Sequence, residues 1–274
     1  MDVEAIEGKI SELEEMLEEL ESVVVAFSGG VDSSVIAALA YKALGTRAIA
    51  LTIDSPLLPG DELEGASAVA RHIGINHDVI KLNELNIKEF KSNPENRCYV
   101  CKKNRYNTLK KFAEDRGYNA VLEGTNVSDL EQYRPGIRAS REIGVLAPLI
   151  KIGLDKKDTR GVARYLDLPN ADKPSNSCLA SRIPYNQEIT AGRLSRISNA
   201  EKIVKELTEV KTIRVRDHGD LARIEVGADE RSRLYGEGVM DEISDKLKNL
   251  GYRFVAMDLE GYRFGSYDSE LEDG

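Results

Sequence analysis

The chain of 274 residues contains no tryptophan and only three cysteines and three histidines. It also lacks any apolar run near the length of about eighteen residues that a membrane-spanning helix needs, so no membrane partner is expected. The N-terminal segment MDVEAIEGKI has neither the basic nor the apolar region of a signal peptide, which predicts a cytoplasmic protein. An odd number of cysteines argues against a secreted disulfide framework. In a reducing cytoplasm, clustered thiols are more often ligands or catalysts than cross-links.

A surplus of positive charge is missing as well. The formal net charge is −9 and the sequence pI is about 5.1. Proteins that bind nucleic acid through their general surface usually show a basic balance or a basic stripe. Nucleic acid is therefore not an expected partner, although a local basic patch can lie within an acidic total.

What the sequence does contain is an alternation of strand and helix patterns over its first 125 residues. Apolar residues at helical spacing predict a helix over 2–20, and the glutamates between them indicate a solvated face. The other predicted helices lie at 32–44, 61–73 and 102–116, and the strands at 22–27, 47–53, 77–82 and 119–125. This alternation predicts an α/β fold with a doubly wound parallel sheet. The loops after residues 27, 53 and 124 should then meet at the carboxyl ends of the strands, where such sheets bind ligands.

The pattern changes near residue 174. The segment KPSNSCLASRIPYNQEIT, residues 173–190, has little periodicity and several turn formers, so it is predicted to be a loop. The elements expected after it are a helix at 190–207, strands at 211–216 and 221–226, a helix at 239–249 and a strand at 252–258. We therefore predict two domains, an α/β domain over 1–175 and a smaller α+β domain over 176–274, the latter for substrate binding or oligomerisation.

The stretch FSGGVDSS, residues 27–34, is the most informative motif. Its two glycines allow a sharp turn that exposes successive N–H groups to an anion. The hydroxyls of Ser33 and Ser34 and the dipole of the following helix strengthen such a site. A simple helix cap uses the same elements, but the full string after an apolar strand favours a phosphate site. No lysine follows the glycines, so the motif is not a Walker A loop.

The string SGGVDS resembles the PP-loop, SGGxDS, of the ATP pyrophosphatase superfamily, whose fold is the adenine nucleotide alpha hydrolase type. The resemblance implies cleavage of ATP between its α and β phosphates, transfer of AMP to a substrate and release of pyrophosphate. A catalytic Asp32 beside phosphates requires a cation between them, which implies Mg²⁺. Glu123 is predicted as a second magnesium ligand, or else as a turn cap, and Thr52 as an adenine-edge residue, or else as a buried strand residue. The residues expected to bind ATP are Ser28, Gly29, Gly30, Asp32, Ser33, Ser34, Thr52, Gly124 and Thr125.

The three cysteines are Cys98 and Cys101, in the stretch RCYVCKK, and Cys178. A redox disulfide is expected in a thioredoxin-like setting, which the phosphate loop does not match. Zinc needs four ligands, and the histidines are scattered along the chain. Three thiolates suit a [4Fe–4S] cluster with one open iron, which can hold the sulfide that a thiolase needs. A chance pair beside a buried third cysteine is the structural alternative.

Four longer strings closely resemble the LarE family. They are EGTNVSDLEQYRPGIRASREIGVLAPL (123–149), PSNSCLASRIPYNQEIT (174–190), IRVRDHG (213–219) and ARIEVG (222–227). The resemblance extends over residues 22–265, which is nearly the whole chain. LarE proteins are the sulfur transferases that build the nickel-pincer nucleotide cofactor of lactate racemase.

The LarE resemblance implies a substrate and a sulfur source. The implied substrate is pyridinium-3,5-biscarboxylic acid mononucleotide, whose carboxylate is adenylated and then converted to a thiocarboxylate. Some members use the cysteine that matches Cys178 as a sacrificial sulfur donor, which ends as dehydroalanine. Others use cysteines that match Cys98, Cys101 and Cys178 as ligands of a [4Fe–4S] cluster. Because all three are present here, the resemblance implies the cluster type, with an external sulfide source, and it also implies a homo-hexamer.

The arginines fit an anionic substrate, since planar forked donors suit carboxylates and phosphate. Arg214 and Arg216 alternate on one face of a predicted strand and match the family's substrate-phosphate arginines. Arg182, in CLASR, is a further predicted substrate ligand. A further basic segment contains Arg134, Arg138 and Arg141. These arginines are predicted either to bind pyrophosphate or to form salt bridges to Glu131 and Glu142.

Two other functions fit parts of this pattern. A PP-loop tRNA thiolase also combines a CxxC pair with a third cysteine, but it should carry a basic face or an RNA-binding appendage. A non-enzymatic sensor of nucleotide or iron–sulfur clusters would bind ATP without releasing pyrophosphate. The net charge of −9 disfavours the first, and pyrophosphate release separates the second from the LarE reaction.

Overall fold

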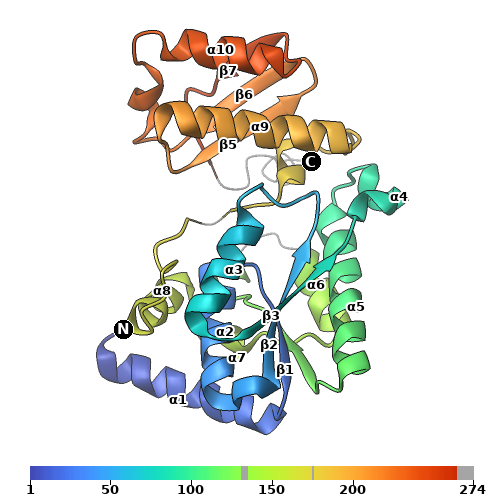
Figure 1. Cartoon of the computed structure of the whole chain (residues 1–274), viewed down its shortest axis with the longest axis vertical. Helices are drawn as coiled ribbons and strands as arrows, with labels where there is room; N and C mark the ends of the chain where they lie inside the picture. Colours follow the sequence, from blue (N-terminus) through green and yellow to red (C-terminus); the bar gives the residue numbers. More distant parts are fainter. Residues whose placement is uncertain (131–134, 175, 264–274) are drawn as a thin grey trace. The chain divides into compact units, whose positions relative to one another are not determined.

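The computed structural model describes residues 1–130, 135–174 and 176–263 (Figure 1). The chain forms two compact units. The first contains Met1–Glu84 and Asn96–Ser175, and the second contains Leu85–Glu95 and Asn176–Gly274. Within the described residues, no helix is both long enough and apolar enough to cross a membrane.

The first unit is built on a four-stranded parallel sheet. Its strands are β1 (Val23–Ala26), β2 (Ala48–Asp54), β3 (Asn76–Lys81) and β4 (Ala120–Leu122), in the spatial order β3-β2-β1-β4. Because all four strands are parallel, the loops after β1 and β4 lie at the same edge of the sheet. The order in which strands are added reverses after β3, so β4 lies on the other side of β1, and open α/β sheets bind ligands at such a switch point.

Helices cover both faces of this sheet (Figure 1). They are α1 (Val3–Leu20), α2 (Val31–Leu44), α3 (Glu62–Ile73), α5 (Arg97–Arg116), α6 (Pro135–Ile143), α7 (Pro148–Lys151) and α8 (Lys156–Tyr165). Successive strand residues point to opposite faces. Val23 and Val25 accordingly pack with α1, α2 and α8, whereas Val24 packs with α5 and α6. The predicted doubly wound α/β fold is confirmed.

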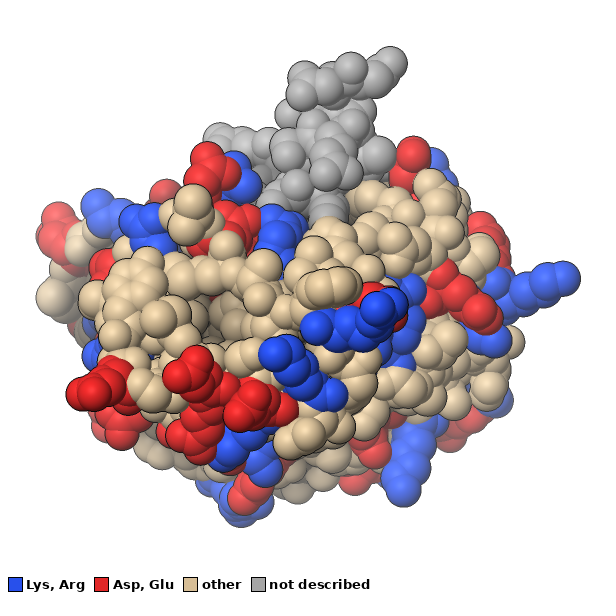
Figure 2. Space-filling model, turned by 90° about the horizontal axis from the view of Figure 1, so that it is seen from above, with Lys and Arg blue, Asp and Glu red and all other residues tan. Residues whose placement is uncertain are grey.

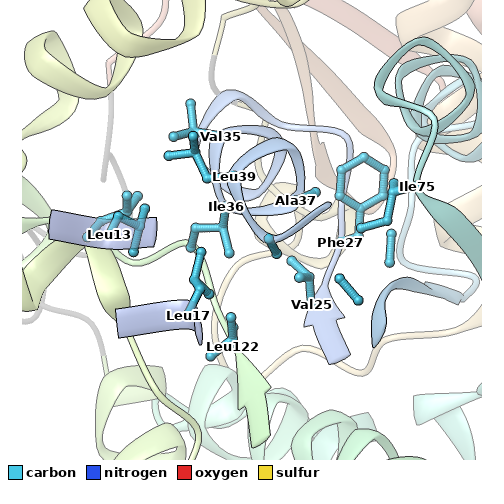
Figure 3. Close-up of a cluster of buried hydrophobic side chains, with 14 of the residues drawn as sticks. Leu13, Leu17, Val25, Phe27, Val35, Ile36, Ala37, Leu39, Ile75 and Leu122 are labelled. Carbon is cyan, nitrogen blue, oxygen red and sulfur yellow. The ribbon is translucent and has the colours of Figure 1, made fainter. Parts of the chain in front are cut away.

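The larger apolar core lies between the sheet and α1, α2 and α3. Leu13 and Leu17 of α1 reach toward Ile36 of α2 and Leu122 of β4 (Figure 3). All four of these side chains are fully buried. The core holds β1 and α2 rigidly together, and the turn that joins these two elements is the predicted phosphate loop.

The second unit contains a three-stranded sheet in the order β5-β6-β7. Strands β5 (Ile213–His218) and β6 (Leu221–Val226) are antiparallel, and β7 (Phe254–Met257) runs parallel to β6. The helices of this unit are α4 (Lys88–Lys91), α9 (Ala191–Thr208) and α10 (Val239–Asn249). Apolar residues of α9 and α10 pack on one face of the sheet, which confirms the predicted small α+β unit.

Two regions differ from the predicted elements. Helix α5 begins at Arg97 rather than at residue 102, so Cys98 and Cys101 lie in its first turns and not in a preceding loop. Asn96 occupies the N-cap without a side-chain capping bond, so no local signal marked this start. Helices α6, α7 and α8 also lacked a clear prediction, because their apolar residues are few.

Candidate functional site

The predicted phosphate loop joins β1 to α2. Gly29 adopts a left-handed conformation with φ of +67°, and Gly30 is the N-cap of α2. A glycine N-cap leaves the first N–H groups of the helix without a capping side chain. The turn therefore presents backbone donors and the positive end of a helix dipole, which is the geometry of an anion site.

Close packing explains the glycines on either side of this turn. A Cβ atom on Gly29 would lie 2.6 Å from the Cα atom of Ala66 in α3. A Cβ atom on Gly124, which follows β4, would lie 2.8 Å from the backbone nitrogen of Ser33. Only glycine, which has no Cβ atom, allows the chain at residue 29 to pack this closely against α3 and the chain at residue 124 to pack this closely against the first turn of α2.

The serine hydroxyls are turned inward. Ser34 is fully buried, and its hydroxyl donates to Gly30 O at 2.8 Å. Ser33 Oγ lies 3.1 Å from Gly30 O and 3.2 Å from Ser28 Oγ. These contacts hold the loop in shape, so in this conformation the expected hydroxyl donors are engaged within the protein. The backbone N–H groups of Ser28 and Gly30 make long hydrogen bonds of 3.3 Å to Ser33 Oγ and Ser28 Oγ.

Asp32 lies in the first turn of α2, where burial outweighs the opposing charges of Lys156 and Arg160. Burial raises the pKa of Asp32 above its usual value, although a hydrogen bond from Asn126 opposes this effect. The Nδ2 atom of Asn126 is 3.2 Å from Asp32 Oδ1. A partly buried carboxylate with a raised pKa gains from a nearby cation, so Asp32 fits a magnesium ligand.

Glu123, directly after β4, is balanced differently. Its Oε2 atom accepts hydrogen bonds from Tyr106 and from Lys102 Nζ, the latter at 3.2 Å. Burial would raise the pKa of Glu123, but Lys102 and Tyr106 outweigh burial, and the pKa lies below its usual value. Because Lys102 already neutralises this carboxylate, Asp32 fits a cation better than Glu123 does.

Two more predicted ATP residues lie at the same sheet edge. Thr52, in β2, is buried, and its hydroxyl lies 2.8 Å from both Phe27 O and His77 Nε2. Thr125 is also buried and follows Gly124. The structure thus brings the loops after β1 and β4 and the last part of β2 together, as the parallel topology requires.

The cysteine pair lies one helical turn apart at the start of α5. Cys98 is exposed, Cys101 is partly buried, and both are thiols rather than disulfide partners. The Sγ atom of Cys101 lies 3.9 Å from Glu84 Oε1, and that oxygen also accepts a 2.7 Å bond from Arg105 Nε. Within the parts of the chain that are described, no group of three or more Cys, His, Asp or Glu residues is close enough to hold a metal ion.

The third cysteine belongs to the second unit. Cys178 is a partly exposed thiol and is the N-cap of a short 3₁₀ turn, Leu179–Arg182. Arg182 is completely buried and donates to the backbone oxygens of Ser177 and Cys178 at 2.8 and 3.0 Å. Its guanidinium also pairs with Glu201 of α9. These contacts hold the Cys178 loop in shape, and substrate binding by Arg182 stays a prediction.

Arg214 and Arg216 are neighbours on the face of β5 that the apolar core does not use. Arg216 donates to Glu225 Oε2 and to Ser181 O, each at 2.8 Å. Arg214 lies against the ring of Tyr262, and burial together with Arg182 lowers its pKa from the usual value. Among the described residues, three buried arginines stand beside the carboxylates of Glu201 and Glu225, and their forked donors are of the kind that suits an anion.

The structure describes only part of the other predicted basic segment, which contains Arg134, Arg138 and Arg141. Arg134, with the proposed partner Glu131, lies outside the described residues. Arg138 forms a 3.3 Å salt bridge with Glu142 and covers the ring of Tyr99, which supports the salt-bridge alternative for Arg138. On the face drawn in Figure 2, lysines and arginines alternate with acidic residues and form no continuous stripe.

Several residues around these sites carried no signal in the sequence. They are Lys102, Asn126, Asn170, Glu201 and Glu225. Each acts through a contact with a residue distant in the chain. Glu225 lies on β6 and contacts Arg216 of the neighbouring strand β5, and Glu201 lies on α9 and contacts Arg182. Placing the predicted helices and strands side by side could have suggested these two contacts.

Comparisons with known proteins extend these observations. The family model for asparagine synthase matches residues 13–91. The chain is 40% identical over 266 residues to the uncharacterized protein slr1717 of Synechocystis sp., covering 97% of this chain and 99% of that protein. It is 34% identical over 258 residues to the pyridinium-3,5-bisthiocarboxylic acid mononucleotide synthase of Lactiplantibacillus plantarum, covering 93% and 92% of the two chains. It is also 28% identical over 226 residues to one of the subunits of the glutamine-hydrolyzing GMP synthase of Archaeoglobus fulgidus, covering 75% and 71%.

Proposed function

Because the chain belongs to the LarE family of ATP-dependent PP-loop enzymes, we propose that it is a sulfur transferase of nickel-pincer nucleotide biosynthesis. Its proposed substrate is pyridinium-3,5-biscarboxylic acid mononucleotide. A carboxylate of this substrate attacks the α phosphate of ATP, pyrophosphate leaves, and an acyl adenylate forms. Sulfide then attacks the acyl carbon of this adenylate. The bond between the acyl carbon and the phosphate oxygen breaks, AMP departs, and the substrate becomes a thiocarboxylate.

The observation that carries this proposal is the glycine turn at the start of α2 with Asp32 beside it. The turn provides backbone donors for phosphates, and Asp32 provides a carboxylate that a cation would stabilise. When bound, Mg²⁺ would shield the phosphate charge and favour departure of pyrophosphate. We assign ATP binding to the first domain, residues 1–175, through Ser28, Gly29, Gly30, Asp32, Ser33, Ser34, Thr52, Gly124 and Thr125.

The second domain, residues 176–274, is proposed to bind the substrate. The mononucleotide carries a phosphate and two carboxylates, and Arg214 and Arg216 are the forked donors that match such groups. Glu225 holds Arg216 in place, and Arg182 with Glu201 holds the loop of Cys178. The arginine cluster and the third cysteine are therefore linked within one unit.

The sulfur is proposed to come from an external sulfide source rather than from the protein. Cys98, Cys101 and Cys178 are all thiols with some exposure, so as donors they fit a [4Fe–4S] cluster of the three-cysteine type. When bound, such a cluster would supply the sulfide for the second step. The sacrificial use of Cys178 is the competing route. We further propose that the enzyme is cytoplasmic and a homo-oligomer.

The proposal is tested by mixing the protein with ATP, Mg²⁺, sulfide and the mononucleotide. Pyrophosphate release that depends on the mononucleotide, followed by a thiocarboxylate product detected by mass spectrometry, is the expected result. The Asp32→Asn variant should fold but release no pyrophosphate, because its neutral amide cannot hold the cation. Pyrophosphate release that requires tRNA instead would favour the tRNA thiolase, and ATP binding without any release would favour a sensor.

A further inference from the structure

Asn170 follows α8 and directs its side chain at the phosphate loop. Its Nδ2 amide donates two hydrogen bonds of 2.9 Å, one to Gly29 O and one to Ser34 Oγ. Because a carbonyl oxygen can only accept, the contact with Gly29 fixes which end of the amide faces the loop. The residue as a whole is 7% exposed. One buried residue from outside the motif thus contacts both the turn and the first helical turn.

The bond to Gly29 O sets the direction of the peptide between Gly29 and Gly30. In a trans peptide the C=O and N–H groups point in opposite directions. The described part of the chain has no cis peptide, so the N–H of Gly30 points away from Asn170. Its present acceptor is Ser28 Oγ at 3.3 Å, which is a long hydrogen bond. A phosphate oxygen would be a stronger acceptor for the same N–H.

The bond to Ser34 acts on the next carbonyl. The Ser34 hydroxyl accepts from Asn170 and donates to Gly30 O at 2.8 Å. Asn170 therefore orients the hydroxyl that holds this second carbonyl. With both glycine carbonyls tied inward, the turn presents N–H groups without carbonyl oxygens that would repel an anion.

We propose that Asn170 is a positioning residue for ATP, which keeps the carbonyls of Gly29 and Gly30 away from the phosphates. This role rests on the proposed ATP-dependent function. The other polar atom of the side chain, Oδ1, is buried and accepts no hydrogen bond within the described part of the chain. A side chain selected only to stabilise the fold would be expected to use both of its polar atoms.

The test is the Asn170→Asp variant, which has nearly the same shape but places an acceptor against Gly29 O. The KM for ATP in substrate-dependent pyrophosphate release should rise about tenfold or more, because one hydrogen bond is lost and a repulsion is created. Calorimetry with Mg²⁺ and a non-hydrolysable ATP analogue should show the same loss of affinity. Affinity for the mononucleotide should remain that of the wild type. Ser34→Ala removes one of the two acceptors of the Asn170 amide and should cause a smaller rise in the KM for ATP. This variant replaces Asn170→Asp in the test if Asn170→Asp does not fold.

The matched control is Asn93→Asp in the second unit. Asn93 is fully buried, and its Nδ2 atom donates to Pro184 O at 2.8 Å. This variant should lose thermal stability comparably while it keeps wild-type affinity for ATP. Equal ATP affinities in the wild type, Asn170→Asp and Ser34→Ala would overturn the positioning role alone. A wild-type protein that binds no ATP would overturn the proposed function, and this role with it.

Discussion

Arg182 and Glu201 form a two-point ion pair inside the second unit. The distance from Nε to Oε1 is 2.8 Å, and that from the second terminal nitrogen to Oε2 is 3.1 Å. Arg182 also donates to the backbone oxygens of Ser177 and Cys178. The conformation of the loop that carries the third cysteine therefore depends on a largely buried charge pair.

This pair predicts a large loss of stability on truncation. Arg182→Met removes the guanidinium but keeps much of its volume. Glu201 then loses its two-point ion pair and keeps the 3.1 Å hydrogen bond from the backbone N–H of Val215. The free energy of unfolding in urea should fall by about 3–5 kcal/mol. The control is Arg164→Met, which breaks an exposed pair with Asp172 and should change stability by about 0.5 kcal/mol or less. Equal losses in both variants would contradict the role assigned to Arg182.

The arginines on β5 lead to a prediction about substrate binding. Arg214→Ala or Arg216→Ala should each weaken binding of the mononucleotide by about 1.5–3 kcal/mol, the value of a hydrogen bond to a charged group. Affinity for ATP should not change, and calorimetry with each ligand in turn measures both. Arg253→Ala, which breaks an exposed pair with Asp220 in the same unit, is the control and should alter neither affinity. Loss of both ligands in the arginine variants would point instead to misfolding.

The sequence predicted the elements better than the contacts between them. The strands of both sheets were foreseen within a few residues, because apolar runs and glycine turns are local signals. The role of Arg182 could not be read in the same way. Arg182 was predicted as a substrate ligand because a guanidinium suits an anionic substrate, but its burial and its contact with Glu201 depend on how α9 packs. Asn170 and Lys102 were missed for the same reason.

The two partly buried histidines predict a pH dependence of stability. Burial, with a contribution from Arg223, lowers the pKa of His218, and burial also lowers the pKa of His77. Below the usual value of 6.5 the unfolded chain then binds more protons than the folded protein. The free energy of unfolding should therefore fall as the pH decreases through 6.5 toward the lowered values, and it should level off above 6.5.

Urea unfolding at a series of pH values measures this slope. His218→Asn should reduce it, and the double variant with His77→Asn should reduce it further, because asparagine does not titrate in this range. A slope of the opposite sign, or one that the double variant leaves unchanged, would contradict the assignment to these histidines.

The last prediction concerns the source of sulfur, for which the cluster and the sacrificial route differ in stoichiometry. With a cluster and added sulfide, anaerobically reconstituted protein should turn over repeatedly, and its mass should stay constant because no protein sulfur is consumed. With Cys178 as the donor, each protein molecule would transfer one sulfur, lose the mass of hydrogen sulfide and stop. Cys98 lies on α5, apart in sequence from Cys178, so Cys98→Ala should abolish activity and lower iron content only if the pair ligates a cluster. Intact-protein mass spectrometry and iron analysis of the wild type and this variant give the answer. Dehydroalanine at residue 178 after turnover would exclude the cluster route, whatever iron the protein contains.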